Sequence, residues 1–436
     1  MKYSEIQLPE EALAAIRTLE QCGHEAWAVG GCVRDLLLGR TPGDADVATS
    51  ATPAQMLDAF QSIRLIPTGI RHGTMTAILA GRPVEITTYR QDGDYRDFRR
   101  PEQVTFARTL EEDLSRRDFT VNGMAYHPRR GLMDRFGGMD DLKGKIIRTI
   151  GPAAERFGED ALRILRAFRF MAQLDFSLDE DTFFAAGKCR EGLRRISPER
   201  ITSELGKLLS CPGPGSAVQA LLRSQALDWI LPRTSENVPD GMNRQPPEEI
   251  LRLALLMSGL PHEEAERRLC FLRLPAKKEK AVRFLLRQGG EEITPEKAAD
   301  RNWVRLGMMQ MGFENFRMYC RYRSFRDDSW KAADAAAEEI SRSGECYRMA
   351  DLAVNGNDLL AAGIPPVQIG GILNMLLAGA AGGKIKNERA ALLERAGKLL
   401  KAFSEPERET PFSGAERYRP AVRSDESKKK EEKNGI

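Results

Sequence analysis

The stretch GGCVRDLLLGRTPGDADVATSATP, residues 30–53, decides the fold of the first part of the chain. Its two leading glycines end a short apolar run and open a predicted helix over residues 33–38. A Pro-Gly turn then precedes a predicted strand over residues 45–48. Thr52 and Pro53 are the residue types expected at the cap and first position of another helix. This alternation predicts a domain that mixes helices with a small sheet.

Two carboxylates flank the start of the strand. Asp44 and Asp46 are two residues apart, so in a strand their side chains project from one face. Two like charges this close repel each other unless a cation lies between them. Mg²⁺ prefers oxygen ligands, and a pair of such ions can activate an attacking hydroxyl and neutralise a leaving oxygen. The pattern predicts a two-metal site with Asp44 and Asp46 as its ligands; the alternative is a solvated strand end.

The glycines before this pair suit a phosphate. Gly30 and Gly31 would let the backbone approach an anion at a helix start, and Arg34, one turn further on, could add a fork of donors. Together with the two aspartates, they predict a site for a nucleoside triphosphate and metal. It differs from a P-loop, because no G-K-[ST] follows. The alternative is an ordinary tight turn.

Glu85 is the candidate for a third catalytic carboxylate. It lies in PVEITTYR between Val84 and Ile86, so on a strand its side chain points opposite to theirs. If that face also carries the two aspartates, Glu85 completes the site. The alternative is a solvent-facing glutamate on a half-buried strand.

Farther from this stretch, the pattern changes along the chain. Apolar spacing predicts a helix over residues 9–22 and strands over 63–66, 74–80 and 83–89. After about residue 135, apolar residues recur at spacings of three and four, which predicts an α-helical body. The last residues, 404–436, are charged and poor in apolar side chains, which is typical of a disordered tail.

Composition excludes several classes of protein. The net charge is only +3, so any nucleic-acid binding must come from local basic surface. The seven cysteines include no C-x-x-C, which argues against a disulfide framework or a zinc site. The chain shows no signal-peptide pattern and no apolar run of about 18 residues. We therefore expect a cytoplasmic protein that does not enter a membrane; its oligomeric state is open.

The quoted stretch, together with RRDFTVNGMAY at residues 116–126, resembles the first two signatures of class II tRNA nucleotidyltransferases and bacterial poly(A) polymerases. These belong to the DNA polymerase β-like nucleotidyltransferase superfamily. The resemblance implies an α+β fold, with a small N-terminal mixed sheet and helices followed by an elongated all-α body. It also implies that Arg117 and Asp118 hold the triphosphate and ribose. The usual Asn-Ala of the second motif is Asn122-Gly123 here.

Two further segments match later signatures. In residues 133–151, Gly137–Gly138 would form a flexible hinge between the sheet domain and the helices. In EDALRILRAFRF, residues 159–170, Asp160 and Arg163 would share one face of a helix. The resemblance implies that this pair reads the incoming base as a protein template, with Arg166 and Arg169 in support. Without the resemblance, an Asp-Arg pair at this spacing is an ordinary surface ion pair.

The remaining segments bear on the RNA and the product. Residues 194–209 resemble the fifth signature: Ser197 would cap a helix, and nearby arginines would add a phosphate-binding face to the Arg163, Arg166 and Arg169 stripe. Residues 89–114 resemble a mobile loop that CCA-adding and A-adding relatives retain. Residues 352–377 resemble a C-terminal element that grips the tRNA elbow.

These expectations combine into one domain plan and one function. We expect four parts: a catalytic head at 1–138, a base-recognition neck at 139–210, a helical tRNA-binding body at 211–403 and the tail at 404–436. The implied activity adds C, C and A to the tRNA 3′ end from CTP and ATP with Mg²⁺ and no nucleic-acid template. The alternatives are an A-adding enzyme, a poly(A) polymerase, or an inactive RNA-binding protein on the same scaffold.

Overall fold

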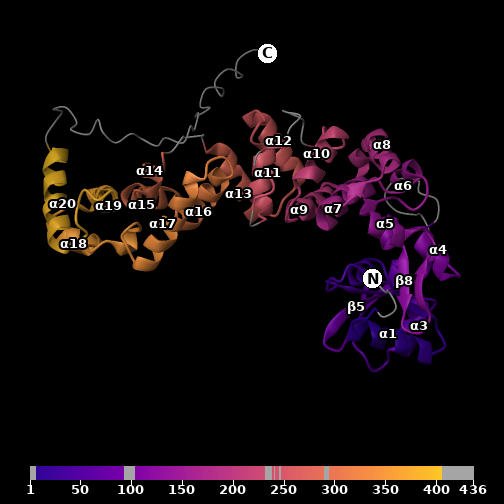
Figure 1. The fold of residues 1–436 in the computed structure, drawn as a ribbon. Helices are drawn as coiled ribbons and strands as arrows, with labels where there is room; N and C mark the ends of the chain where they lie inside the picture. The colour runs from indigo at the N-terminus through magenta and orange to yellow at the C-terminus, as the bar shows by residue number, and fades with distance from the viewer. Residues whose placement is uncertain are drawn as a thin grey trace, which may run out of the picture. The chain divides into compact units, whose positions relative to one another are not determined.

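The computed structural model describes residues 6–92, 104–230, 238–239, 241–244, 247–288 and 294–404 (Figure 1). Its contacts divide the chain into two compact units. Unit 1 comprises Met1–Val238, Gln245–Glu249 and Cys270–Leu274, and unit 2 comprises Pro239–Arg244, Ile250–Leu269 and Pro275–Ile436. The finer boundaries at residues 138, 210 and 403 stay predictions, as does the tail, of which residues 405–436 lie outside the described ranges.

Unit 1 contains a seven-stranded mixed sheet with strand order β3-β4-β5-β2-β1-β8-β9. Neighbouring strands are antiparallel except β2 and β5, which run parallel. The strands are β1 (Ala26–Val29), β2 (Ala45–Thr49), β3 (Leu65–Gly69), β4 (Thr74–Leu79), β5 (Arg82–Thr88), β8 (Met124–His127) and β9 (Gly131–Asp134). Two small sheets pair β6 (Arg90–Asp92) with β7 (Val104–Phe106), and β10 (Ile146–Ile147) with β11 (Ser177–Leu178).

Helices complete unit 1, as the repeated spacings of three and four predict. In chain order they are α1 (Glu10–Gln21), α2 (Gly31–Leu37), α3 (Pro53–Ala59), the 3₁₀ turn η1 (Ile70–His72), α4 (Leu110–Ser115), the 3₁₀ turn η2 (Thr120–Asn122), α5 (Gly138–Gly144), α6 (Ala153–Glu159), α7 (Leu162–Leu174), α8 (Glu180–Lys188), η3 (Arg190–Arg195), α9 (Pro198–Leu209) and α10 (Gly215–Arg223). The predicted α+β class of the head is confirmed.

Unit 2 consists of helices and connecting turns, with no strand among its described residues. Helices α11 (Glu249–Met257) and α12 (His262–Leu272) have residues in both units. The rest are α13 (Ala276–Arg287), α14 (Pro295–Ala299), α15 (Arg301–Met311), α16 (Phe313–Ser324), α17 (Ser329–Ser343), η4 (Met349–Asp351), α18 (Gly356–Ala361), α19 (Pro366–Ala381) and α20 (Arg389–Ser404). Within the described ranges, no helix combines the length and apolar character needed to cross a membrane.

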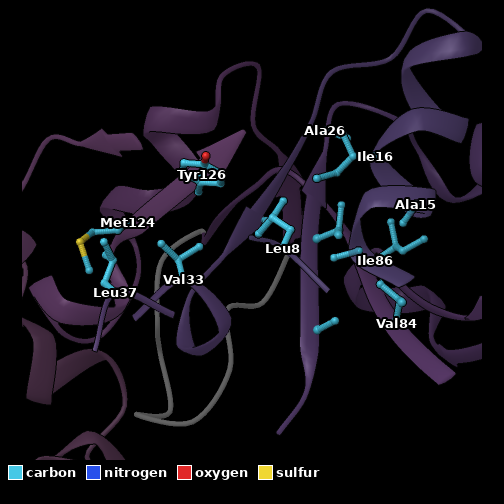
Figure 2. Packing of buried hydrophobic residues seen from close by; sticks show 14 of the residues in the cluster. Leu8, Ala15, Ile16, Ala26, Val33, Leu37, Val84, Ile86, Met124 and Tyr126 are labelled. Carbon is cyan, nitrogen blue, oxygen red and sulfur yellow. The ribbon is translucent and has the colours of Figure 1, made fainter. Parts of the chain in front are cut away.

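The sheet buries apolar side chains on both faces, and this alternation orients the polar residues of the site. On one face, residues of α1 such as Ala15 and Ile16 belong to the same cluster as Val84 and Ile86 of β5 (Figure 2). Val47 of β2 belongs to this cluster too. Side chains alternate along a strand, so the intervening polar residues of β2 and β5 project from the opposite face.

Local sequence signals explain several element ends. Thr52 and Gln55 form a capping box at the start of α3, with Pro53 at its first position, as predicted. Ser197 does occupy the cap position of α9, but its side chain makes no capping hydrogen bond, so that part of the prediction was wrong. Part of the expected mobile loop, residues 89–114, is regular structure: β6, β7 and the first residues of α4. Its residues 93–103 lie outside the described ranges.

The expected hinge at Gly137–Gly138 forms the turn into α5, and its second glycine is tightly packed. Gly137 has φ +76°, which favours glycine, and caps α5. The backbone amides of Gly138 and Met139 each donate to the Asp134 carboxylate at 2.8 Å. A Cβ on Gly138 would lie 2.4 Å from the carbonyl oxygen of Thr120. Gly138 therefore allows a close backbone approach and Gly137 allows the left-handed turn, while a hinge role for the pair stays a prediction.

Gly138→Ala should destabilise the head for this reason. The added methyl meets backbone, which cannot swing away, and overpacking of this kind costs about 1–3 kcal/mol. Urea titration followed by circular dichroism should show a lower midpoint than for the wild-type protein. Gly158→Ala is the control, because a Cβ on Gly158 would meet no atom within 4 Å. Equal stabilities of the two variants would contradict the packing argument.

Candidate functional site

Parallel pairing of β2 with β5 brings the predicted carboxylates to one face of the sheet. Asp46 is the register partner of Glu85, and Asp44 precedes β2 by one residue. Val47, Val84 and Ile86 belong to the cluster on the other face, which leaves Asp46 and Glu85 on the face opposite α1. Asp44 and Glu85 are exposed and Asp46 is half-buried. Glu85 therefore shares a face with Asp46, as expected, and Asp44 lies just before β2.

The charges of these carboxylates are poorly compensated. Burial raises the pKa of Asp46 to about 6, and the charges of Glu85 and Asp44 add to the rise, although Arg117 opposes it. A divalent cation would relieve this repulsion, so the donor set fits Mg²⁺. No group of three His, Cys, Asp or Glu side chains anywhere in the described residues is arranged to hold a metal ion. The metal-ligand roles of Asp44 and Asp46 and the catalytic role of Glu85 all stay predictions.

Gly30 lies next to the guanidinium of Arg117 and the carboxylate of Asp46. It has φ +69° and ψ −134°, a conformation that disfavours any side chain. A Cβ there would lie 2.8 Å from Nη1 of Arg117 and 3.9 Å from Oδ2 of Asp46. The Gly30 amide donates to the carbonyl of Met124 at 3.2 Å. Gly30 therefore serves the site by leaving room for Arg117 beside Asp46.

Asp113, which sequence reasoning missed, holds Arg117 in this position. Its carboxylate accepts from Arg117 Nη2 at 3.1 Å and from Arg116 Nη2 at 2.6 Å, and its side chain is only 1% exposed. Burial alone would raise the pKa of Asp113, but the charges of Arg117 and Arg116 outweigh it and lower that pKa. The signal was present in the sequence, since Asp113 precedes Arg116 and Arg117 by three and four residues, as in helical ion pairs.

Arg34 is a buried part of the frame around the site. It is 4% exposed, and its guanidinium lies under Gly31, with Nη2 3.6 Å from where a Cβ of that glycine would be. Nη1 donates to Oδ1 of Asn122 at 2.8 Å, and Nε donates to Asp35 at 2.8 Å. The sequence did not predict these partners. A phosphate contact for Arg34, Gly30 or Gly31 stays a prediction.

Asp118 joins the second motif to α7. It accepts from Nε and Nη2 of Arg166 at 2.8 and 2.5 Å, and from Nδ2 of Asn122 at 3.2 Å. Burial acts to raise the pKa of Asp118, but the charge and hydrogen bonds of Arg166 prevail and lower that pKa to about 2. Asp118 is therefore ionised, and both of its carboxylate oxygens accept hydrogen bonds.

Asp160 and Arg163 do not share a helix face, which corrects the expected geometry. Helix α6 ends at Glu159, Asp160 has extended backbone, and α7 begins at Leu162. Oδ2 of Asp160 accepts from Arg200 at 2.7 Å. Arg163 pairs with Glu159, and its Nη2 donates to the carbonyl of Arg116 at 3.0 Å. Spacing alone could not show that the helix breaks between the two residues.

The expected basic stripe of α7 is largely neutralised by carboxylates. Arg163 pairs with Glu159, Arg166 with Asp118, and Arg169 with Glu204 of α9, where Nε lies 2.7 Å from Oε2. These pairs join α7 to the second motif and to α9. The stripe thus positions helices, and it offers less free charge to RNA phosphates than the sequence implied.

Three family models match consecutive parts of the chain. The Poly A polymerase head domain matches residues 26–148, and the RNA and SrmB-binding site of polymerase A matches residues 175–237. Domain 2 of tRNA nucleotidyltransferases matches residues 244–396.

Individual relatives agree with these models. The CCA-adding enzyme of Lactobacillus delbrueckii subsp. bulgaricus is 35% identical over 405 residues, which cover 88% of this chain and 96% of the relative. The CCA-adding enzyme of Geobacillus kaustophilus is 48% identical over 229 residues, which span 52% of this chain and 56% of that relative, about half its length. The solved structure of the Bacillus stearothermophilus CCA-adding enzyme with CTP aligns with a TM-score of 0.78 and 30% identity, over 90% of this chain and 98% of that one.

Proposed function

The chain belongs to the CCA-adding enzyme family of nucleotidyltransferases, and from that premise we propose that it adds C, C and A to the 3′ end of tRNA. The substrates are CTP and ATP, and pyrophosphate is released. The observation that carries the proposal is the meeting of Asp46 and Arg117 at the Gly30 turn, with Asp44 and Glu85 close enough for their charges to act on Asp46. An inactive RNA-binding scaffold would have no need of this crowded acidic group beside a guanidinium.

Mg²⁺ is the metal that suits these oxygens. Asp44 and Asp46 would hold it, with Glu85 as the neighbouring carboxylate on the same face. When bound, it would lower the charge on the triphosphate and favour ionisation of the attacking hydroxyl.

The residues of the chain supply position and charge for an in-line displacement at the α-phosphate. Arg117 is held by Asp113 through Nη2, and its Nη1, which has no hydrogen-bond partner among the described residues, lies at the Gly30 turn, where it can neutralise a phosphate. The Arg34 guanidinium packs next to Gly31 and so supports the turn. Because folding already orders these side chains, binding of the triphosphate requires little further loss of conformational entropy.

We assign base selection to Asp160 and Arg163, with Arg166 and Arg169 in a supporting role. An aspartate accepts from the exocyclic amine that C and A both carry, and an arginine donates to ring nitrogen or carbonyl. Arg163 already contacts the carbonyl of Arg116, beside Arg117, which supports a base site next to the triphosphate site. The helices of unit 2 would bind the acceptor stem and elbow by shape and phosphate contacts.

The reducing cytoplasm is the proposed location. All seven cysteines of the chain fall within the described residues, and none of them forms a disulfide there. Cysteines without disulfides are typical of that compartment.

Labelled nucleotides test the product directly. CTP or ATP would be supplied separately to tRNA transcripts that end before C74, C75 or A76, with Mg²⁺ present. We expect CMP on the first two transcripts and AMP on the third. AMP on the CC-ended transcript alone would identify an A-adding enzyme, and long A tails would identify a poly(A) polymerase. No incorporation on any transcript would leave the RNA-binding alternative.

A further inference from the structure

We propose that Asn122 is a positioning residue that couples the triphosphate turn to the segment of Arg117 and Asp118. The inference rests on the proposed function and deepens it. Asn122 lies in η2 and is 6% exposed. Among the described residues, its side chain bonds Arg34 and Asp118, and it makes no hydrogen bond to the proposed metal-site carboxylates. Its effect on nucleotide binding would therefore be transmitted through its partners.

The amide of Asn122 bridges two groups that only an amide can satisfy together. Its Oδ1 accepts from Nη1 of Arg34, a pure donor, and its Nδ2 donates to Oδ1 of Asp118, an ionised acceptor. A carboxylate in the same place could serve Arg34 but would repel Asp118. An aliphatic side chain would serve neither. The two partners thus determine the orientation of the amide.

The bridge closes a circuit of five side chains. Arg34 and Arg166 each place a guanidinium 5.3 Å from the centre of the Phe170 ring. Arg166 binds Asp118, Asp118 binds Asn122, and Asn122 returns to Arg34. The members come from α2, α7, η2 and the turn before it. A closed circuit of this kind resists displacement of any one element, because each contact depends on the next.

Two members of the circuit, Arg34 and Asp118, lie next to the proposed nucleotide site. Arg34 lies under Gly31 of the phosphate turn. Asp118 follows Arg117, whose guanidinium lies over Gly30 beside Asp46. If the Asn122 bridge is broken, Arg34 and the segment that carries Arg117 are no longer held in fixed positions relative to each other. The consequence is a poorer fit for the triphosphate, seen as weaker binding of CTP and ATP alike.

Asn122→Asp is the sharpest test, because it changes one nitrogen to oxygen and keeps the contact with Arg34. We expect at least a tenfold rise in Kd for CTP and for ATP, measured by calorimetry with Mg²⁺ and without tRNA, and a similar rise in KM. The KM for tRNA should stay within about twofold. Asn122→Ala should show a similar rise, because it removes both contacts.

Thr49→Val is the matched control. Thr49 is fully buried at the other end of β2; its Oγ1 donates to the carbonyl of Glu25 at 2.7 Å and accepts from the amide of Ala51 at 3.1 Å. It therefore loses two buried hydrogen bonds, as Asn122→Ala does, but outside the circuit. We expect it to lower thermal stability and leave nucleotide Kd unchanged.

The outcomes separate the two proposals. A merely structural role for Asn122 predicts fewer folded molecules, hence lower kcat with unchanged Kd and KM, and that result would overturn the inference. Unchanged kinetics would overturn it too. Wild-type protein that binds CTP but extends no tRNA would refute the proposed function, while the Asn122 variants would still test the coupling. Wild-type protein that binds neither nucleotide would refute both.

Discussion

Replacing Asp46 with asparagine should lower CMP incorporation into tRNA by about 10³-fold or more. Asparagine keeps the size of the side chain but removes the charge that holds a divalent cation. A catalytic metal ion is worth several kcal/mol of transition-state stabilisation, and about 4 kcal/mol corresponds to 10³-fold in rate. Single-turnover incorporation of labelled CMP on a transcript lacking CCA measures this loss. The Asp44→Asn variant should show a comparable loss.

Folding and RNA binding should survive this substitution. Loss of one charge relieves the repulsion that Glu85 and Asp44 exert on Asp46, so the thermal midpoint should not fall. Binding of tRNA, measured by filter retention, should remain within about twofold of wild type. Asp58→Asn, an exposed change on α3 of the same unit, should behave as wild type throughout. Undiminished incorporation by the Asp46 variant would remove the proposed metal role.

Gly30→Ala should lower kcat/KM for CTP and ATP by about 100-fold. Its Cβ would lie 2.8 Å from Nη1 of Arg117, so the guanidinium must leave its place beside Asp46. The positive φ adds backbone strain of about 1 kcal/mol or more. A shift of a catalytic group by an ångström can cost 10²-fold in rate. Steady-state kinetics with saturating tRNA would measure the effect.

Gly39→Ala separates strain from displacement. Gly39 also has φ +69°, but a Cβ there would meet nothing within 4 Å. It should lose stability through strain and keep its kinetic constants. If both alanine variants lost activity equally, backbone strain rather than Arg117 would explain the Gly30 result.

Local patterns in the sequence determined much of the architecture. The alternation around Asp46 and Glu85 predicted a shared face that the strand register bears out, whereas Asp44 lies one residue before the strand. Thr52 and Pro53 predicted the start of α3. These predictions succeed because strand alternation and helix capping depend on residues only a few positions apart. The change from mixed structure to helices near residue 135 was visible for the same reason.

Tertiary structure alone decided which charges remain free. The sequence predicted a phosphate contact for Arg34 and a role for Arg166 in base reading and in a phosphate-binding face. Asn122 and Asp118, which lie 88 and 48 residues away from them, accept hydrogen bonds from these guanidinium groups. The packing of Gly138 against the carbonyl of Thr120 also depends on a partner distant in the sequence. A charged side chain shows its type and spacing in the sequence, but its partner is set by contacts across the fold. The residue types of the proposed site could therefore be predicted from the chain, whereas the network that positions them could not.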